Sequence, residues 1–263
     1  LAAAGAGTMA VITDPTFLES MKVSYTNGAP AGVNIGFTSP SGPDADDLLQ
    51  ANALAGLVAQ GLTPEALIGN VFLGGGGLSS LFAVFVAIFL ATEFESGFSK
   101  NVFTVQPNRL AFLGARFLEI AILAAVFTAL IVVATLATAA VAGLPLIMSP
   151  LPDLLLWTAL VVLAATGFGM LTALAVWVTR KMAAGIVIGI VLAAGLVTLA
   201  LQSVLLLFPS ASFLADFTLS SCMSSLSLGL AGPLGVPHIA LVCAAFIIVA
   251  AAASAVVLQR KDV

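Results

Sequence analysis

The chain has 263 residues, of which 61% are hydrophobic and only 8% are charged, and its formal net charge is −4. A soluble domain carries about 25% charged residues, so this composition excludes a soluble globular enzyme. The acidic balance also excludes a nucleic-acid-binding protein, which needs a basic face. The sequence therefore predicts an integral membrane protein built of apolar α-helices.

The chain opens with a run of small apolar residues, Leu1–Ile12. A signal peptide would carry a basic segment ahead of its apolar run, and this run has none. We expect residues 1–12 to be the end of a first membrane span that begins before Leu1. The polar residues 13–76 follow, and we expect them to form a small cap on the outer side of the membrane.

Two stretches of this polar segment carry helix signals. Residues 44–60 combine acidic residues at the start with apolar residues at helical spacing. The sequence Thr63-Pro64-Glu65 supplies an N-cap, a proline at the first helical position and an acid in the first turn. We therefore expect a helix over residues 44–60 and another that begins at Pro64.

Runs of about 20 apolar residues are long enough to cross the hydrocarbon core as helices. The sequence contains five such complete runs: Leu78–Phe94, Phe112–Val141, Leu155–Val178, Met182–Phe208 and His238–Leu258. With the run that ends at Ile12, six spans are expected. The predicted fold class is an all-α, polytopic transmembrane helix bundle, with residues 77–263 as the transmembrane domain.

Basic residues predict the orientation of these spans. All Lys and Arg residues except Lys22 fall in alternate connections or at the end of the chain: Lys100, Arg109, Arg116, Arg180, Lys181, Arg260 and Lys261. Connections rich in Lys and Arg face the cytoplasm. We therefore expect a multi-pass protein of the plasma membrane whose ends are both cytoplasmic at full length.

Two tryptophans, Trp157 and Trp177, lie near the two ends of one predicted span. A helix of about 20 residues rises about 30 Å, which is close to the thickness of the hydrocarbon core. We expect the two indoles to anchor opposite membrane interfaces, with a chance placement as the alternative.

Motifs for catalysis or metal binding are absent from the sequence, which has no GxxxxGK[ST] loop, no HExxH and no cluster of Cys and His. The single histidine, His238, begins the last predicted span, where a wetted helix-end residue is the simplest interpretation. Cys222 and Cys243 do not form a disulfide framework. We expect no catalytic residue, no metal site and no cofactor on this chain.

The interiors of the last four predicted spans are free of ionisable side chains from Ile120 onward. Such a group costs at least about 2.5–3.5 kcal/mol at membrane depth, and it therefore marks the pathway of an ion or proton where it occurs. If this protein moves a substrate uphill, its energy must come from another subunit.

The connection after the first complete run has a distinct pattern. Two acids end the run, a glycine follows, and apolar and polar residues then alternate until Pro107. We expect a short amphipathic helix over residues 96–107 that lies along the membrane surface, with Gly97 at its bend.

This stretch resembles the cytoplasmic pattern E-x-E-x-G-x-x-K-N, followed by an apolar pair and an Arg, of permease subunits of type-2 ABC exporters. The matching residues are Glu93, Glu95, Gly97, Lys100, Asn101 and Arg109. The resemblance extends to the topology along nearly the whole chain, with six expected spans and a large outer loop between the first two.

The resemblance implies that residues 96–107 form a coupling helix, seated in a cleft of a separate ATPase subunit that binds ATP and Mg²⁺. The residues assigned to coupling are Glu93, Glu95, Gly97, Phe98, Lys100, Asn101, Val102, Phe103 and Arg109. The glycine makes the bend, the three apolar residues form the docking face, the acids brace the helix end, and the other polar residues contact the ATPase. The alternative is an ordinary loop whose charges end the spans.

Two further segments fit a transporter. Gly185 and Gly189 form a GxxxG pair that favours close helix packing, although such pairs are common in any alanine-rich span. Residues 209–237, which contain no Lys or Arg, are expected either as short re-entrant helices at the outer mouth or as a plain loop.

We expect the permease subunit of an ATP-driven exporter, working in a bacterial-type plasma membrane as a dimer of permease chains, identical or different, with two ATPase subunits. Charge-free spans favour a hydrophobic or amphipathic substrate, such as a lipophilic drug, an antimicrobial peptide or a lipid-like molecule. The alternative from another class is a channel or facilitator that needs no ATPase. An adjacent gene for an ATPase would distinguish the two.

Overall fold

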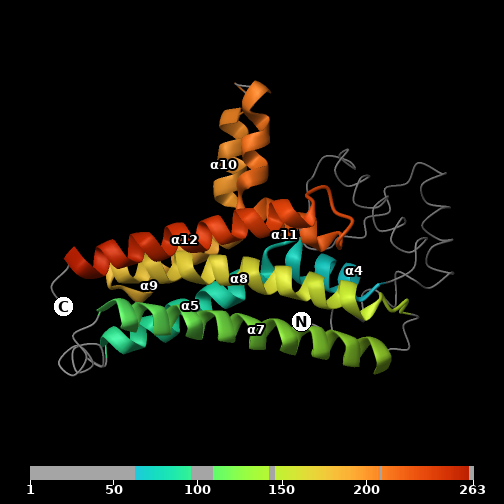
Figure 1. Ribbon diagram of the computed structural model, residues 1–263, viewed down its shortest axis with the longest axis horizontal. Coiled ribbons are helices and arrows are strands. Elements are labelled where there is room, and N and C mark those ends of the chain that lie inside the picture. Colours follow the sequence, from blue (N-terminus) through green and yellow to red (C-terminus); the bar gives the residue numbers. More distant parts are fainter. Residues whose placement is uncertain (1–62, 96–108, 142–145, 206, 208, 261–263) are drawn as a thin grey trace, which may run out of the picture. The chain divides into compact units, whose positions relative to one another are not determined.

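The computed structural model describes residues 63–95, 109–141, 146–205, 207 and 209–260 (Figure 1). These residues form helices joined by short turns, which confirms the predicted all-α fold. The chain divides into two compact units, one of Leu1–Leu67 with Val133–Ser149 and the other of Ile68–Val132 with Pro150–Val263.

In the first unit, a helix begins at Pro64 as predicted. It is α4 (Pro64–Ile68), and the Thr63 hydroxyl caps it by accepting a hydrogen bond from the Ala66 backbone N–H at 3.3 Å. Glu65 in its first turn is buried, and its carboxylate accepts a hydrogen bond from the Ser149 hydroxyl at 2.8 Å. The helix predicted over residues 44–60 and the predicted remnant of a first span, 1–12, lie outside the described residues.

Within the described residues, three helices are long and apolar enough to cross a membrane. They are α7 (Arg109–Val141), α8 (Leu151–Thr179) and α12 (Val236–Arg260). The bent pair of α9 (Met182–Ala193) and α10 (Leu196–Leu205) makes a fourth if it is one span. Helix α5 (Gly77–Glu95) is apolar but shorter.

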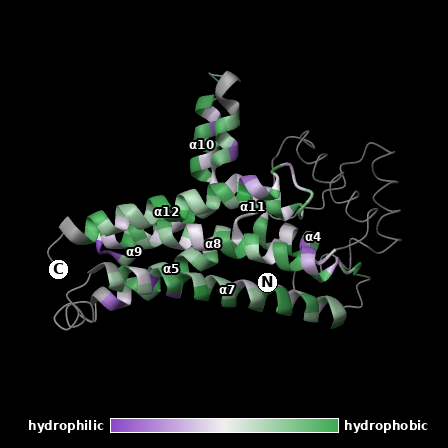
Figure 2. Ribbon diagram, viewed as in Figure 1, coloured by the Kyte–Doolittle hydropathy of each residue, from purple (hydrophilic) through white to green (hydrophobic). Residues whose placement is uncertain are grey.

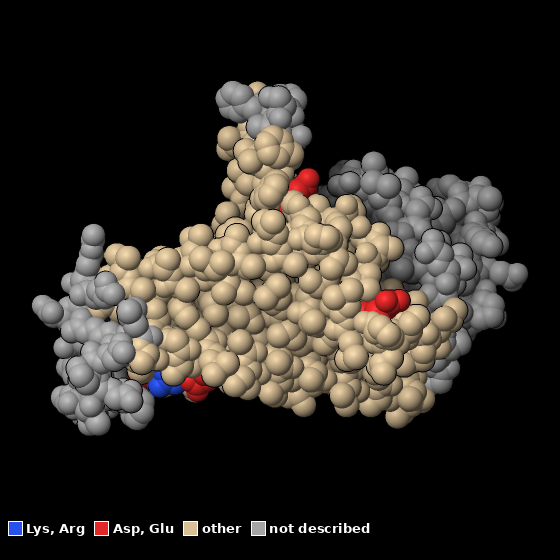
Figure 3. Space-filling model, viewed as in Figure 1, with Lys and Arg blue, Asp and Glu red and all other residues tan. Residues whose placement is uncertain are grey.

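Hydrophobic residues dominate the surfaces of these helices as well as their contacts. Figure 2 shows that hydrophobic residues predominate along α7, α8, α9 and α12, and Figure 3 shows how few charged side chains lie on the face in view. Large apolar side chains such as Leu130 and Ile248 are more than half exposed. Such a surface suits lipid rather than water, so the structure supports a membrane protein.

The second unit is built around α8, which packs against α5, α9, α12 and the short helix α11 (Leu219–Ser227). Its apolar residues are spread around the whole helix axis, and a helix of that kind is buried in a protein core or in a membrane. Trp157, Val161 and Ala164 are fully buried as a result. Helix α8 is therefore the core of this unit.

Small residues bring α9 close to α5 and α8. A Cβ added to Gly189 would lie 2.9 Å from the Ala83 Cβ and 3.0 Å from the Thr172 Oγ1. A Cβ added to Gly185 would lie 2.3 Å from the Val176 Cγ2. Both members of the GxxxG pair thus face neighbouring helices of the same chain.

The run Met182–Phe208, expected as one helix, is broken. Helix α9 ends at Ala193, α10 begins at Leu196, and the two are bent by 52°. Gly195 lies at the break with a φ of +74°, a conformation that glycine adopts without steric cost. The 3₁₀-helix η2 (Pro209–Phe217) and then α11 follow, so short helices occupy part of the segment 209–237.

Both tryptophans of α8 are buried between helices. The Trp157 Nε1–H donates a hydrogen bond to the Leu226 carbonyl of α11 at 2.8 Å. The Trp177 ring lies 5.7 Å from the Phe117 ring of α7, measured between centroids. The prediction that the two indoles anchor the membrane interfaces is therefore wrong, because their rings pack against protein.

Candidate functional site

In the sequence, α5 precedes and α7 follows residues 96–108, the stretch predicted to couple this chain to an ATPase. The end of α5 meets the start of α7 at Glu93 and Arg116, and Phe82 meets Phe127 further along both helices, with ring centroids 5.9 Å apart. These two contacts show that α5 and α7 run antiparallel. The connecting residues therefore begin and end at one end of this helix pair.

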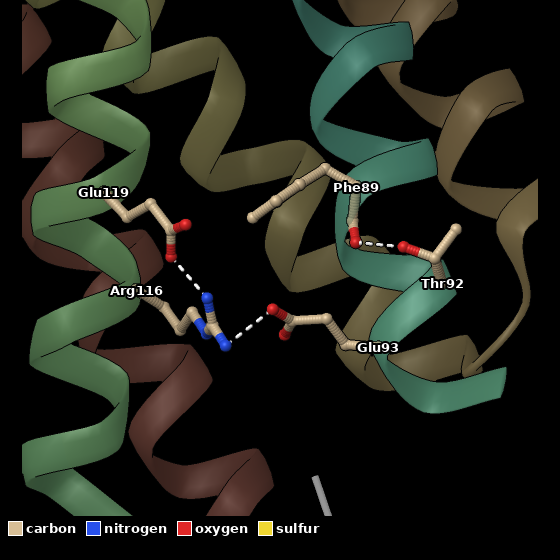
Figure 4. Close-up of polar contacts among 5 residues, drawn as sticks. All are labelled: Phe89, Thr92, Glu93, Arg116 and Glu119. Carbon is tan, nitrogen blue, oxygen red and sulfur yellow. Dashed lines mark hydrogen bonds and ion pairs between the residues drawn. The ribbon is translucent and has the colours of Figure 1, made fainter. Parts of the chain in front are cut away.

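A cluster of three charged residues joins the two helices at that end (Figure 4). The Arg116 Nη2 lies 2.5 Å from the Glu93 Oε1, and the Arg116 Nη1 donates to the Glu119 Oε2. We call Glu93, Arg116 and Glu119 the Arg116 cluster. Two carboxylates and one guanidinium give it a net charge of −1. The Arg116 and Glu93 side chains are only 13% and 15% exposed, so this ion pair is largely withdrawn from solvent.

Aromatic rings complete the surroundings of the guanidinium. The Arg116 Cζ lies 5.2 Å from the centroid of Phe112 and 6.0 Å from that of Phe89. A guanidinium over a ring face within about 6 Å is attracted by about 0.5–1 kcal/mol at exposed sites and more when desolvated. Arg116 therefore bonds α5 both through a carboxylate and through a ring.

The cluster fixes the ends of α5 and α7 to each other. Removing one partner of a buried ion pair costs about 3–5 kcal/mol, because a charge is left without a partner. The cost is lower here, since the Glu119 side chain is 37% exposed and water screens it. A displacement of the connection 96–108 would still move both helix ends together.

The turn between α8 and α9 lies at the same end of the second unit. Trp177 contacts Phe117, which neighbours Arg116, and Arg180 and Lys181 follow within one turn. Arg180 ends α8 with a φ of 54°, and its backbone N–H bonds to the Val176 carbonyl. Basic residues from two separate connections are thus brought to one end of the unit.

The structure describes part of the predicted coupling set. Glu93 belongs to the Arg116 cluster. Glu95 ends α5 and Arg109 begins α7, but their side chains lie outside the described part of the chain. The remaining residues also lie outside it: Gly97, Phe98, Lys100, Asn101, Val102 and Phe103.

Sequence reasoning missed Glu119 and gave Arg116 no partner. The spacing of these two residues was an available signal, because residues three apart share one face of a helix. The bond from Glu93 to Arg116 had no such signal, since it depends on the path of the connection between the helices.

Among the described residues, no group of three or more His, Cys, Asp and Glu side chains could hold a metal ion. Cys222 and Cys243 are free thiols, and both are buried.

In comparisons with protein-family models, with curated proteins and with solved structures, the chain has no match.

Proposed function

We propose that this chain is the permease subunit of an ATP-driven exporter of the ABC class. It works with a separate ATPase subunit and a second permease chain, and it moves a hydrophobic or amphipathic substrate across the plasma membrane. The observation that carries this proposal is the Arg116 cluster, which ties together the two helix ends beside residues 96–108.

The contacts between the helices offer a path along which a movement of residues 96–108 would reach the rest of the second unit. A partner that pushes on residues 96–108 moves α5 and α7 together, because the Arg116 cluster joins them. Helix α5 also packs closely on α9, where Gly189 allows Ala83 to approach. Movement at the connection would thus reach α8 and α9 through contacts too tight to absorb it.

The distribution of charge supports an external source of energy. Beyond Glu119, the Asp, Glu, Lys, Arg and His side chains of α8 and α12 in the described residues are Asp153 and His238 near the starts of these helices, and Arg260 at the end of α12. Between these positions the helices hold apolar and hydroxyl side chains, the Cys243 thiol and, next to Arg260, Gln259. These residues supply no series of carboxylates or imidazoles that could relay protons or ions.

The direct test is reconstitution in proteoliposomes with an ATPase subunit, which the proposal expects to be encoded by an adjacent gene. We expect the two proteins to purify together, and we expect transport of a lipophilic fluorescent dye to require ATP. Dye transport at full rate without any ATPase would contradict the proposal and favour a channel or facilitator.

Variants of the Arg116 cluster test the coupling step. Arg116→Gln should reduce ATP-dependent transport on the order of tenfold, a typical coupling effect between sites, while the partner still hydrolyses ATP. Asp153→Asn, which removes a charge far from the cluster, is the matched control and should transport normally. The double variant Glu93→Arg with Arg116→Glu should recover part of the activity, because it restores the ion pair.

A further inference from the structure

A cavity of about 520 Å³ lies in the second unit, between α10, η2 and α11. Pockets for small molecules are typically about 300–1,000 Å³, so its size suits such a ligand. The lining residues are Ala194, Gly195, Thr198, Leu199, Gln202, Asp216, Ser220, Ser221, Ser224, Ser225, Leu228, Pro233 and Leu234.

Two helix faces supply most of this lining. On α10 and the turn before it, Gly195, Thr198 and Gln202 follow one another at helical spacing. On α11, Ser220, Ser224 and their neighbours form a face of hydroxyl groups. The bend at Gly195 turns α10 away from the direction of α9, and the two residues at the break, Ala194 and Gly195, are part of the cavity lining.

Several of these hydroxyl groups already take part in hydrogen bonds with the backbone. The Ser220 hydroxyl donates to the Leu192 carbonyl at 3.2 Å, and the Ser221 hydroxyl donates to the Ala215 carbonyl at 2.7 Å. The Ser225 Oγ accepts from the Leu234 backbone N–H at 3.0 Å. A serine oxygen that donates still has lone pairs to offer. Much of the lining therefore presents hydrogen-bond acceptors.

A carboxylate adds negative charge to this surface. Asp216 lines the cavity and is exposed, whereas Lys and Arg are absent from the lining. His238 holds the backbone there, because its Nε2 lies 3.1 Å from the Asp216 carbonyl oxygen, which can only accept a hydrogen bond. The Phe217 and His238 rings pack edge to face with centroids 4.7 Å apart. The contacts of His238 with the Asp216 carbonyl and the Phe217 ring thus fix the backbone that carries the Asp216 carboxylate.

We propose that this cavity binds an organic ammonium ion with an apolar tail. The ammonium group donates to the Asp216 carboxylate and to the serine oxygens, while the tail lies over Leu199, Leu228 and Leu234. An anion is disfavoured, because Asp216 carries a negative charge and the lining contains no Lys or Arg. A metal ion is disfavoured, because Asp216 is the one carboxylate in the lining and hydroxyl groups supply the rest.

Dansylcadaverine is a suitable probe, because it joins a primary ammonium to a fluorophore that brightens in apolar surroundings. Titrated with the purified chain in detergent micelles, it should show saturable binding. Its N-acetyl derivative keeps the fluorophore but has no charge, and it should bind at least about tenfold more weakly, a difference of about 1.4 kcal/mol. The measurement needs no ATPase, so its outcome is independent of the exporter proposal.

Variants assign the binding to the cavity. Asp216→Asn should weaken dansylcadaverine about tenfold, and Ser224→Phe should block it by filling the space. Asp153→Asn keeps the cavity intact and should bind as the unaltered chain does. Equal binding of the two probes, or unchanged binding by folded Asp216→Asn, would overturn the proposal. Should Asp216→Asn not fold, the same outcomes are read from Ser224→Phe, since Ser224 is exposed.

Discussion

At Gly189, the absence of a side chain allows α9 to pack closely against α5 and α8. It lies where α9 approaches α5 and α8, with the Ala83 Cβ and the Thr172 side chain within about 3 Å of the position of a Cβ. The Ala83 Cβ is fixed to its backbone and cannot rotate away. A methyl group at this position must push helices apart.

Gly189→Ala should therefore lower the thermal stability of the chain, by about 1–3 kcal/mol as overpacked cores generally do. Gly114→Ala is the matched control, because a Cβ on Gly114 of α7 meets nothing within 4 Å. That change should be neutral or stabilising, since alanine favours a helix over glycine by about 1 kcal/mol. Thermal unfolding of both variants in detergent checks the prediction, which fails if their midpoints move together.

At this scale the sequence indicates residue types better than partners. It places Glu93 in the candidate site, because acids at the end of an apolar run are conspicuous. It cannot place Arg116 beside Glu93, because that contact depends on the path of residues 96–108. The orientation of Trp157 is equally hidden, since α8 is apolar on every side and no face is marked as lipid-facing.

The break between α9 and α10 depends on the backbone of Gly195. An L-residue in the left-handed conformation costs about 1–2 kcal/mol. A Cβ at this position would meet Ser220 only at ordinary contact distances of 3.6 Å and more. Conformation, and not crowding, therefore decides the effect of a substitution here.

Gly195→Ala should destabilise the bend by about 1–2 kcal/mol and lower the thermal midpoint. Gly75→Ala is a suitable comparison, because a Cβ there has open space and its φ lies outside the left-handed region. A midpoint for Gly195→Ala equal to that of Gly75→Ala would show that the bend does not require a glycine.

At the level of elements, the long helices could be predicted and their interruptions could not. Helices α7, α8 and α12 begin and end within a few residues of the predicted runs, because apolar length alone specifies them. The break at residues 194–195 lies inside the run Met182–Phe208, where alanine and glycine hardly lower the hydropathy. A bend of this kind therefore cannot be predicted from the hydropathy of the sequence.

For the whole molecule, the two ends of the second unit differ in their content of Lys and Arg. Arg116, Arg180 and Lys181 lie at the end where α5 meets α7, whereas Asp153 lies at the start of α8, a helix length away from Arg180. If the basic end faces the cytoplasm, as the positive-inside rule predicts, the Asp153 end faces outward.

Thiol labelling in intact cells checks this orientation. Both native cysteines, Cys222 and Cys243, are fully buried, so a membrane-impermeant maleimide should leave them unmodified. Asp153→Cys should react with the reagent from outside the cell, and Lys181→Cys should react only after the cells are opened. Labelling of both variants from the same side would contradict the predicted topology.

The class of the molecule could be predicted from composition alone. A chain with 8% charged residues has too few charged side chains to cover a water-exposed surface. Helices can cross a bilayer because their backbone N–H and C=O groups hydrogen-bond to one another within the helix. The arrangement of the helices had no such signal, because apolar helices in lipid associate through shape rather than through a hydrophobic face.

The threonines of α8 have a mechanical consequence. Thr158, Thr166, Thr172 and Thr179 each donate their hydroxyl to the carbonyl four residues earlier in the same helix. Sliding of α8 along its neighbours would therefore break none of these bonds, whereas the Trp157 bond to Leu226 pins one end. The described hydrogen bonds therefore tie α8 to α11 at Trp157, whereas elsewhere along α8 close packing of side chains, and not hydroxyl hydrogen bonds to other helices, holds it in place.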